Sequence, residues 1–115
     1  MNLSSKGTGT VEVSKLALDH GSVQTANGAI SATQSFVIFS KASALAATLA
    51  DGTTQGEMKI MLNQNSGLVT VTPANFAQGT SFSIAQNGAT QCIWSGNNWF
   101  MIGGADSADT YITIT

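Results

Sequence analysis

The sequence predicts an all-β fold, an antiparallel sandwich or barrel of short strands. Thr, Val, Ile and aromatic residues, which favour strands, recur in short runs separated by Gly and Asn. These runs follow one another about every ten residues with tight-turn signals between them, as in sandwiches and barrels. Only 9% of the residues are charged, against about 25% in a typical soluble domain. This disfavours coiled coils and helical bundles, because their exposed faces need Glu and Lys.

The chain has 115 residues, the length of one domain. Residues 1–9 are rich in Ser and Gly and predict a flexible N-terminal arm, followed by a single all-β domain over residues 10–115. Apolar residues make up 43% of the chain. Most of its polarity comes from Thr, Ser, Asn and Gln, a composition that does not fit a charge-rich disordered chain.

The N-terminal half contains two strand candidates and one ambiguous stretch. Residues 10–16 alternate Val11 and Val13 with polar neighbours, which predicts a first strand. Residues 34–40 are apolar on both faces and predict a central strand or one face of a subunit contact. Residues 41–50 are rich in Ala and Leu, so a helical turn stays open. An extended or irregular segment is favoured, because the stretch is short and lacks a charged face.

The C-terminal half predicts a series of strands. Residues 57–62 place Met58, Ile60 and Leu62 on one face of a strand and Glu57, Lys59 and Met61 on the other. Residues 68–72 predict the next strand, which Pro73 ends because proline lacks the N–H for the ladder.

Turn signals divide the remaining sequence. Asn27-Gly28 and Asn87-Gly88 are typical of tight turns. Residues 91–94 and 99–102 flank Ser95-Gly96-Asn97-Asn98 and predict a β-hairpin. Residues 111–115 predict a last strand.

Charge and cysteine content exclude several classes of protein. The net charge is −2, and the lysines, Lys6, Lys15, Lys41 and Lys59, are spread singly along the chain. A nucleic-acid partner is not expected, because binding phosphates needs clustered cations. No apolar run approaches the roughly 20 residues that cross a bilayer, and the N-terminus has no hydrophobic signal core, so no membrane partner is expected. Cys92 has no second cysteine to pair with and is expected to be a small buried residue.

The residues that usually carry chemistry are sparse. His20 is the single histidine and follows Asp19, so on a strand the two side chains would point to opposite faces. A surface role is expected for His20. Asp106 and Asp109 lie in a Gly-rich stretch that could offer oxygen ligands to calcium, although a solvated loop is favoured. We therefore predict no catalytic residue, no metal site and no cofactor.

Aromatic residues provide the candidate contacts. Trp94 and Trp99 flank the predicted hairpin turn and could form a cross-strand pair in the core or between subunits. The alternative is an exposed platform that stacks on sugar rings, with Asn97 and Asn98 supplying amide hydrogen bonds. The residues predicted to make core or subunit contacts are Phe36, Ile38, Phe39, Trp94, Trp99 and Phe100.

Several stretches between residues 36 and 104 resemble a β-module of tailed-phage structural proteins, as found in phages of marine bacteria and cyanobacteria. The resemblance begins with Phe-Val-Ile-Phe-Ser-Lys-Ala-Ser-Ala-Leu at residues 36–45 and continues through Gly-Glu-Met-Lys-Ile-Met-Leu-Asn at residues 56–63. Its more specific parts are Val-Thr-Pro-Ala-Asn-Phe at residues 71–76 and Trp-Ser-Gly-Asn-Asn-Trp at residues 94–99. Such modules occur in head decoration proteins, head fibres and tail fibres.

The resemblance implies a virion structural role, commonly as a homotrimer, with no enzymatic residues to transfer. The short chain favours a capsid decoration (cement) protein, made in the bacterial cytoplasm and placed on the capsid surface against the major capsid protein or another virion protein. A fibre or tail-tip module that binds a host surface glycan is the alternative. The chain from Met1 to its terminal Ile-Thr-Ile-Thr is expected to be a complete protein. Within the arm, Asn2, Leu3 and Lys6 are expected to contact the capsid.

Overall fold

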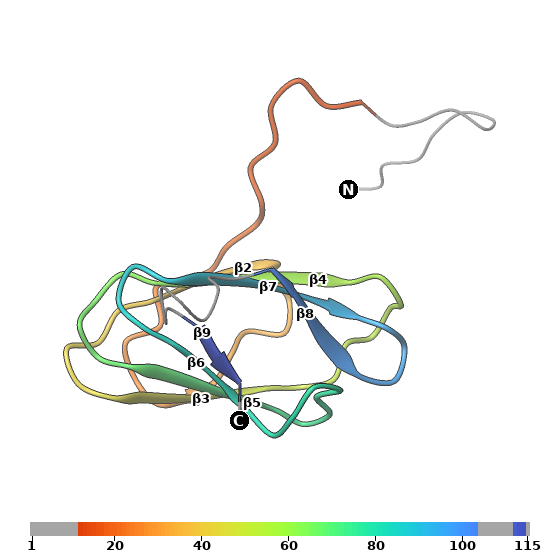
Figure 1. Cartoon of the computed structure of the whole chain (residues 1–115). Helices are drawn as coiled ribbons and strands as arrows, with labels where there is room; N and C mark the ends of the chain where they lie inside the picture. The colour runs from red at the N-terminus through yellow and green to blue at the C-terminus, as the bar shows by residue number, and fades with distance from the viewer. Residues whose placement is uncertain (1–11, 104–111, 115) are drawn as a thin grey trace.

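Two β-sheets pack face to face in the computed structural model, which describes residues 12–103 and 112–114 (Figure 1). The described residues form strands, turns and bends but no helix, and so nothing that could cross a lipid bilayer as a helix. The strands are β1 (Gly28–Ala29), β2 (Phe36–Phe39), β3 (Leu45–Leu49), β4 (Met58–Asn63), β5 (Val69–Pro73), β6 (Phe82–Ile84), β7 (Ala89–Trp94), β8 (Trp99–Gly103) and β9 (Ile112–Ile114). The all-β prediction is confirmed.

The sheets are mixed, so the prediction of a purely antiparallel fold is wrong. One sheet has the order β2-β4-β7-β8 and the other has the order β1-β3-β5-β6-β9. The pairs β2/β4, β1/β3 and β3/β5 are parallel, and the remaining pairs are antiparallel. The cause is the chain path: from β2 to β5 successive strands alternate between the sheets. A strand that returns to the first sheet after such a crossover runs in its original direction, which is how parallel neighbours are joined.

The core lies between the two sheets and is built from alternate positions of the strands. β3 shows the pattern most clearly, since Leu45, Ala47 and Leu49 are buried while the two residues between them are exposed. The extended reading of residues 41–50 is therefore confirmed for β3. The buried apolar cluster comprises Ile30, Val37, Phe39, Leu45, Ala47, Leu49, Met61, Val69, Val71, Phe82, Ile84, Cys92, Trp94 and Trp99.

Local turn signals are reproduced where the chain reverses between neighbouring strands. β7 and β8 pair as the predicted hairpin, with Ser95 N donating to Asn98 O at 2.9 Å. Asn87 has a φ of 66° in the turn before β7, a left-handed conformation that Asn tolerates better than most residues. Gly67 permits a close approach, because a Cβ there would lie 1.8 Å from Ser43 O. The last predicted strand is confirmed by β9, which pairs with β6.

The predicted first strand is wrong in its described part. Residues 12–16 are exposed and belong to no strand. Figure 1 shows this segment leaving the body beside β2. The edge of β2 that it could have joined is already paired with residues 20–24, through bridges of His20 to Phe36 and of Gln24 to Phe39.

Candidate functional site

The outer face of the four-stranded sheet is made of large apolar side chains. Because side chains alternate along a strand, every second residue points away from the core. In β4 the inward-facing residues are Lys59, Met61 and Asn63, so Met58, Ile60 and Leu62 point outward. We call the outward-facing residues of this sheet the apolar face. Its members are Phe36, Ile38, Met58, Ile60, Leu62, Ala89, Gln91, Ile93, Phe100 and Ile102.

The strand register brings these side chains together across the sheet. Phe36 of β2 lies opposite Ile60 of β4. Ile93 of β7 lies between Met58 of β4 and Phe100 of β8. The apolar residues therefore form one continuous surface over four strands. In Figure 1 no described element other than the N-terminal segment rises above this layer.

The apolar face carries no charged residue and only one polar side chain. That residue is Gln91, whose Nε2 lies 3.9 Å from Met58 Sδ. Phe100 and Ile102 are 39% and 54% exposed, and Ile102 lies at an irregularity in the β7/β8 register. Contiguous exposed apolar surfaces on soluble proteins often belong to interaction sites, which makes the apolar face the candidate contact surface.

The outer face of the five-stranded sheet has the opposite character. In β3, β5 and β6 the outward residues are small and mostly carry hydroxyl groups. We call these residues the hydroxyl face: Ala46, Thr48, Thr70, Thr72 and Ser83. Ala46, Thr70 and Ser83 are neighbours across three strands. The hydroxyl oxygens of Thr70 and Ser83 are 3.4 Å apart.

Backbone hydrogen bonds occupy part of both edges of the four-stranded sheet. At the β2 edge, Gln24 N donates to Ile38 O and Ser40 N donates to Gln24 O, each at 2.9 Å. At the β8 edge, Trp99 N donates to Asn75 O at 2.9 Å and Ala77 N donates to Trp99 O at 3.0 Å. These contacts consume backbone groups through which an exposed edge would recruit another strand.

A side-chain amide continues the closure of the β8 edge. Met101 N donates to Gln78 Oε1 at 2.7 Å, and Gln78 Nε2 donates to Met101 O at 3.3 Å. The amide thus takes the place of a peptide group from a neighbouring strand. With both edges occupied in this way, the open surface of this sheet is its apolar face.

The inner side of β4 holds a buried cation. Lys59 is 2% exposed, and its Nζ donates to Ser31 O at 2.7 Å and to Gln34 O at 2.5 Å. Both acceptors belong to the crossover segment (residues 20–35), which passes from β2 to the β3 edge and back along one side of the sandwich. Burial lowers the pKa of Lys59, and the nearby Glu57 carboxylate partly offsets this effect. The lysine thereby fixes the crossover segment from inside the core.

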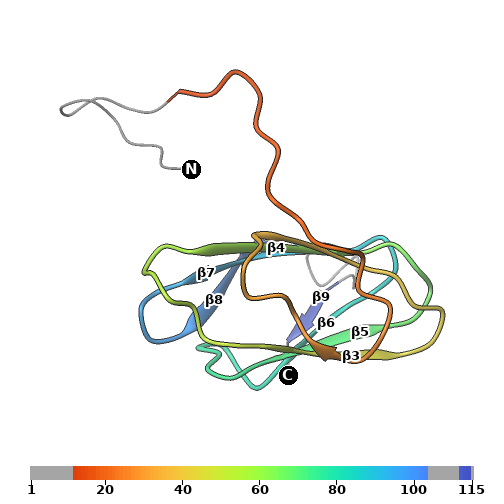
Figure 2. The same ribbon diagram turned by 180° about the vertical axis from the view of Figure 1, so that it is seen from behind.

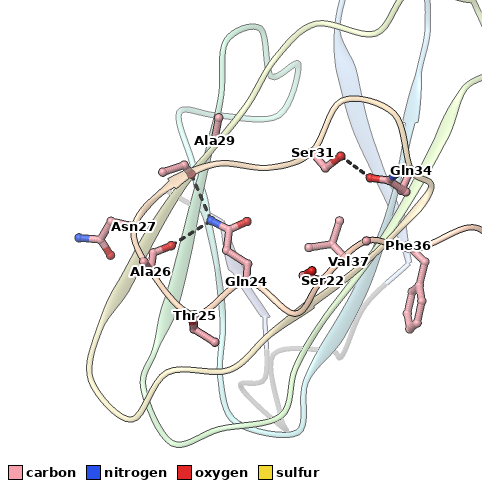
Figure 3. Close-up of a pocket in the computed structure, with 12 residues that line it drawn as sticks. Ser22, Gln24, Thr25, Ala26, Asn27, Ala29, Ser31, Gln34, Phe36 and Val37 are labelled. Atoms are coloured by element: carbon pink, nitrogen blue, oxygen red, sulfur yellow. Dashed lines mark hydrogen bonds between the residues drawn. The ribbon is translucent and has the colours of Figure 1, made fainter.

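The crossover segment also surrounds an open pocket of ≈ 610 Å³ (Figure 3). No charged residue lines it. Several of its polar groups already hold the segment in shape, because Gln24 Nε2 donates to Ala26 O at 3.1 Å and Ser31 Oγ donates to Gln34 Oε1. The pocket offers neutral amide and hydroxyl groups suited to a neutral polar ligand.

Potentially reactive groups are dispersed. His20 is exposed, with Nδ1 3.1 Å from Gly21 O and the ring edge-on to Phe36. Cys92 is buried, and burial raises the pKa of its thiol to about 12, so the nucleophilic thiolate is not available at neutral pH. Among the described residues, no three His, Cys, Asp or Glu side chains are grouped to hold a metal ion. Asp106 and Asp109 lie outside the described residues.

Trp94 and Trp99 form the expected cross-strand pair, and they lie in the core. Their ring centroids are 5.4 Å apart with an interplanar angle of 57°. They are only 5% and 1% exposed, and Trp99 Nε1 donates to Ala50 O at 2.9 Å. The alternative of an exposed sugar-stacking platform made by these two rings is therefore wrong. Asn97 and Asn98 lie in the hairpin turn, where their backbone N–H groups donate to Ser95 Oγ.

The six predicted contact residues divide between two places. Phe39, Trp94 and Trp99 belong to the core, whereas Phe36, Ile38 and Phe100 lie on the apolar face. Asn2, Leu3 and Lys6, the predicted capsid-contact residues, lie outside the described residues. The large side chains of the apolar face that were not predicted as contacts are the apolar Met58, Ile60, Leu62, Ile93 and Ile102 and the polar Gln91. The available signal was the presence of large apolar residues on both faces of residues 36–39 and 58–62.

Comparison with known proteins gives no family assignment. No protein-family model matches the chain, and no curated protein sequence is significantly similar to it.

Proposed function

We propose that this chain is a virion structural protein of a tailed phage, a decoration (cement) protein that binds the assembled head and stabilises it as a small symmetric oligomer such as a homotrimer. The observation that carries the proposal is the apolar face. Ten outward positions on four strands contain one polar residue and no charge. A surface of this composition is stabilised when another protein covers it, because burial removes apolar area from water.

The charge distribution supports an adhesive role. The chain has only ten charged residues, four basic and six acidic. Few ions must therefore lose water when copies pack closely against one another or against a shell, and desolvating ions is costly. The resemblance of residues 36–104 to phage β-modules supports placing this contact on a virion.

Stabilisation of the head would follow from mass action. A protein that binds the assembled lattice, and not its disrupted form, adds RT ln(1 + [L]/Kd) of stability for each occupied site. The decoration protein needs no reaction to have this effect. Its function depends on the area it buries and on the number of sites it fills.

Binding to heads tests the proposal. Heads assembled from the major capsid protein of the same genome, and lacking this chain, would be sedimented with the purified protein. We expect saturable co-sedimentation and a higher temperature of head disruption. The double variant Phe100→Lys/Ile102→Lys should bind at least tenfold more weakly. The control Leu68→Lys, at a side chain that is 48% exposed outside the apolar face, should bind normally. A wild-type protein that never sediments with these heads would contradict the proposal.

A glycan-binding module is the second candidate, favoured by the neutral pocket of the crossover segment. Its amides and hydroxyls suit a sugar, although the core tryptophans do not contribute. Titration with host surface polysaccharide should then perturb NMR signals of Gln24 and Gln34, while signals of the hydroxyl face stay in place. An unchanged spectrum across a broad glycan panel would remove this candidate.

A further inference from the structure

The N-terminal segment leaves the body at the margin of the apolar face. Its last contact is at β2, where Phe36 N donates to Asp19 O at 3.3 Å and His20 bridges to Phe36. We call residues 12–18 the arm segment. They extend away from the sandwich on the side of the four-stranded sheet (Figures 1 and 2). No hydrogen bond or ion pair joins the arm segment to the rest of the described chain.

The arm segment is itself apolar at its exposed positions. Val13 is 50% exposed and Leu16 is 69% exposed. Six large apolar side chains of the described residues are exposed. Four of them lie on these two surfaces, Val13 and Leu16 on the arm segment and Phe100 and Ile102 on the apolar face. The apolar arm segment thus joins the sandwich at β2, the first strand of the apolar face.

The dimensions of the two surfaces match. Neighbouring strands are about 4.8 Å apart, so the three spacings from β2 to β8 span about 14 Å. Seven residues reach at most about 23 Å when fully extended, and the bend at Ser14 and Lys15 shortens this reach. The length still allows the segment to cross the four strands. The arm segment points away from its own sheet, so this geometry presents it to another molecule. Because both edges of the four-stranded sheet are partly occupied, the arm segment would bind the apolar face of that sheet and not one of its edges.

We propose that the arm segment of one copy packs across the apolar face of a second copy and buries Val13 and Leu16 there. Both halves of the contact are present in one chain, so identical copies can satisfy each other. The chain bends at Ser14 and Lys15, so Val13 and Leu16 are not held on opposite sides as they would be in a straight strand. The face carries no charge, and the charged arm residues Glu12 and Lys15 can remain in solvent at its margin. This contact rests on the self-association assumed in the proposed function, and it names the segment that covers the apolar face.

Site-specific crosslinking tests the contact in the full-length protein. One preparation carries Leu16→Cys and the other carries Ile102→Cys, and the two are mixed and oxidised. The native Cys92 is buried, so it should not interfere. We expect a disulfide-linked dimer of the two variants, and far less product when Leu68→Cys replaces Ile102→Cys. Equal yields for the two partners, or no linked dimer, would overturn the proposal.

A chain carrying both Leu16→Cys and Ile102→Cys separates exchange between copies from folding back. Exchange predicts linked oligomers on a non-reducing gel. A monomer with an internal disulfide at every protein concentration would show that the arm covers its own face, and would overturn the proposal.

Self-association provides an independent readout. The variant Val13→Ser/Leu16→Ser should raise the dissociation constant of the oligomer by about tenfold or more, because two apolar side chains are no longer buried. The control Val23→Ser removes an exposed apolar side chain elsewhere and should leave the constant unchanged. An unchanged constant in the arm variant would refute arm docking.

A monomeric arm variant that still binds heads would leave the proposed function standing, whereas a crosslinked oligomer that does not bind heads would refute only the proposed function.

Discussion

The two outer faces of the sandwich are built on the same alternation and carry opposite chemistry. The apolar face presents Phe, Ile, Leu and Met from β2, β4, β7 and β8, whereas the hydroxyl face presents Ala, Thr and Ser from β3, β5 and β6. A single folded sandwich needs only the inner faces to be apolar. Folding of the monomer accounts for the polar outer surface of the hydroxyl face but not for the apolar outer surface of the apolar face. We therefore propose that the apolar face is the surface that meets a partner.

The largest expected effect comes from placing charge on the apolar face. Phe100→Lys/Ile102→Lys should weaken self-association at least a hundredfold, because two ammonium groups would have to lose water in the contact. Both side chains are exposed, so the fold should survive. Sedimentation equilibrium measures the change. Thr48→Lys/Thr72→Lys on the hydroxyl face is the matched control, and equal weakening by that control would remove the distinction between the faces.

A smaller effect is expected from the cation beneath the apolar face. Lys59→Met should lower the free energy of unfolding by about 1–3 kcal/mol, because Ser31 O and Gln34 O lose their donor. Chemical denaturation measures this change. Hydrogen exchange should show faster opening of the crossover segment than of β5. A variant as stable as wild type would mean that Lys59 does not hold the crossover segment.

The same lysine gives a pH dependence with a defined sign. Its pKa is lowered in the folded protein, so the unfolded chain binds more protons between that lowered value and the ordinary value of 10.5. The contribution of Lys59 to stability therefore rises with pH through this window and is lost as pH falls through the folded pKa. Denaturation of wild type and Lys59→Met should show their difference growing between these pH values. A difference that shrinks with rising pH would contradict the sign.

Opening the β8 edge should cost less. Gln78→Ala removes both hydrogen bonds with the Met101 backbone, and we expect a loss of about 1 kcal/mol of unfolding free energy. The amide proton of Met101 should exchange faster, as NMR can measure. The control Gln86→Ala replaces an exposed glutamine that makes no such contact and should have no effect.

The smallest effect on stability comes from making the hydroxyl face resemble the apolar one. Thr48→Val/Thr70→Val/Thr72→Val should change the free energy of unfolding by less than about 0.5 kcal/mol, since Val suits a strand as well as Thr does. Light scattering should instead show new association at high protein concentration. A triple variant that stays as dispersed as wild type would show that apolar side chains alone do not make a sheet face adhesive.

The sequence predicts the local features of this fold better than the long-range ones. The β7/β8 hairpin was predicted from the four-residue turn between its strands. The extended conformation of β3 was predicted because residues 41–50 lack the charged face of a surface helix. The parallel pairing of β2 with β4 could not be predicted, because it depends on an intervening strand that crosses to the other sheet. The predicted strand at residues 10–16 is wrong in its described part. Alternation of apolar and polar residues shows that a segment can form a strand, but not whether a sheet has an unpaired edge for it.

The candidate site was predictable in part. The apolar character of residues 34–40 on both faces predicted a central strand or a subunit contact. The central position is wrong, because β2 is an edge strand of its sheet, but β2 does present Phe36 and Ile38 outward. The two faces of β4 were predicted from the alternation, but not which of them is buried. The structure buries Lys59 and Asn63, while Met58 and Ile60 face out. Asn63 is satisfied there through hydrogen bonds to Gly67 O and Ile84 O. Such partners come from distant residues, so the local sequence alone does not show which side of β4 faces the core.

Methyl NMR with a soluble paramagnetic agent tests the central claim most directly, because it reports both outer faces in one sample. At a protein concentration where the wild type is associated, the methyl groups of Ile60, Leu62 and Ile93 should be protected from the agent. Those of Thr48 and Thr72 should be strongly relaxed, and protection of the Ile and Leu methyls should disappear in Phe100→Lys/Ile102→Lys. Equal relaxation of both sets in the wild type would show that the apolar face has no partner and would contradict the claim.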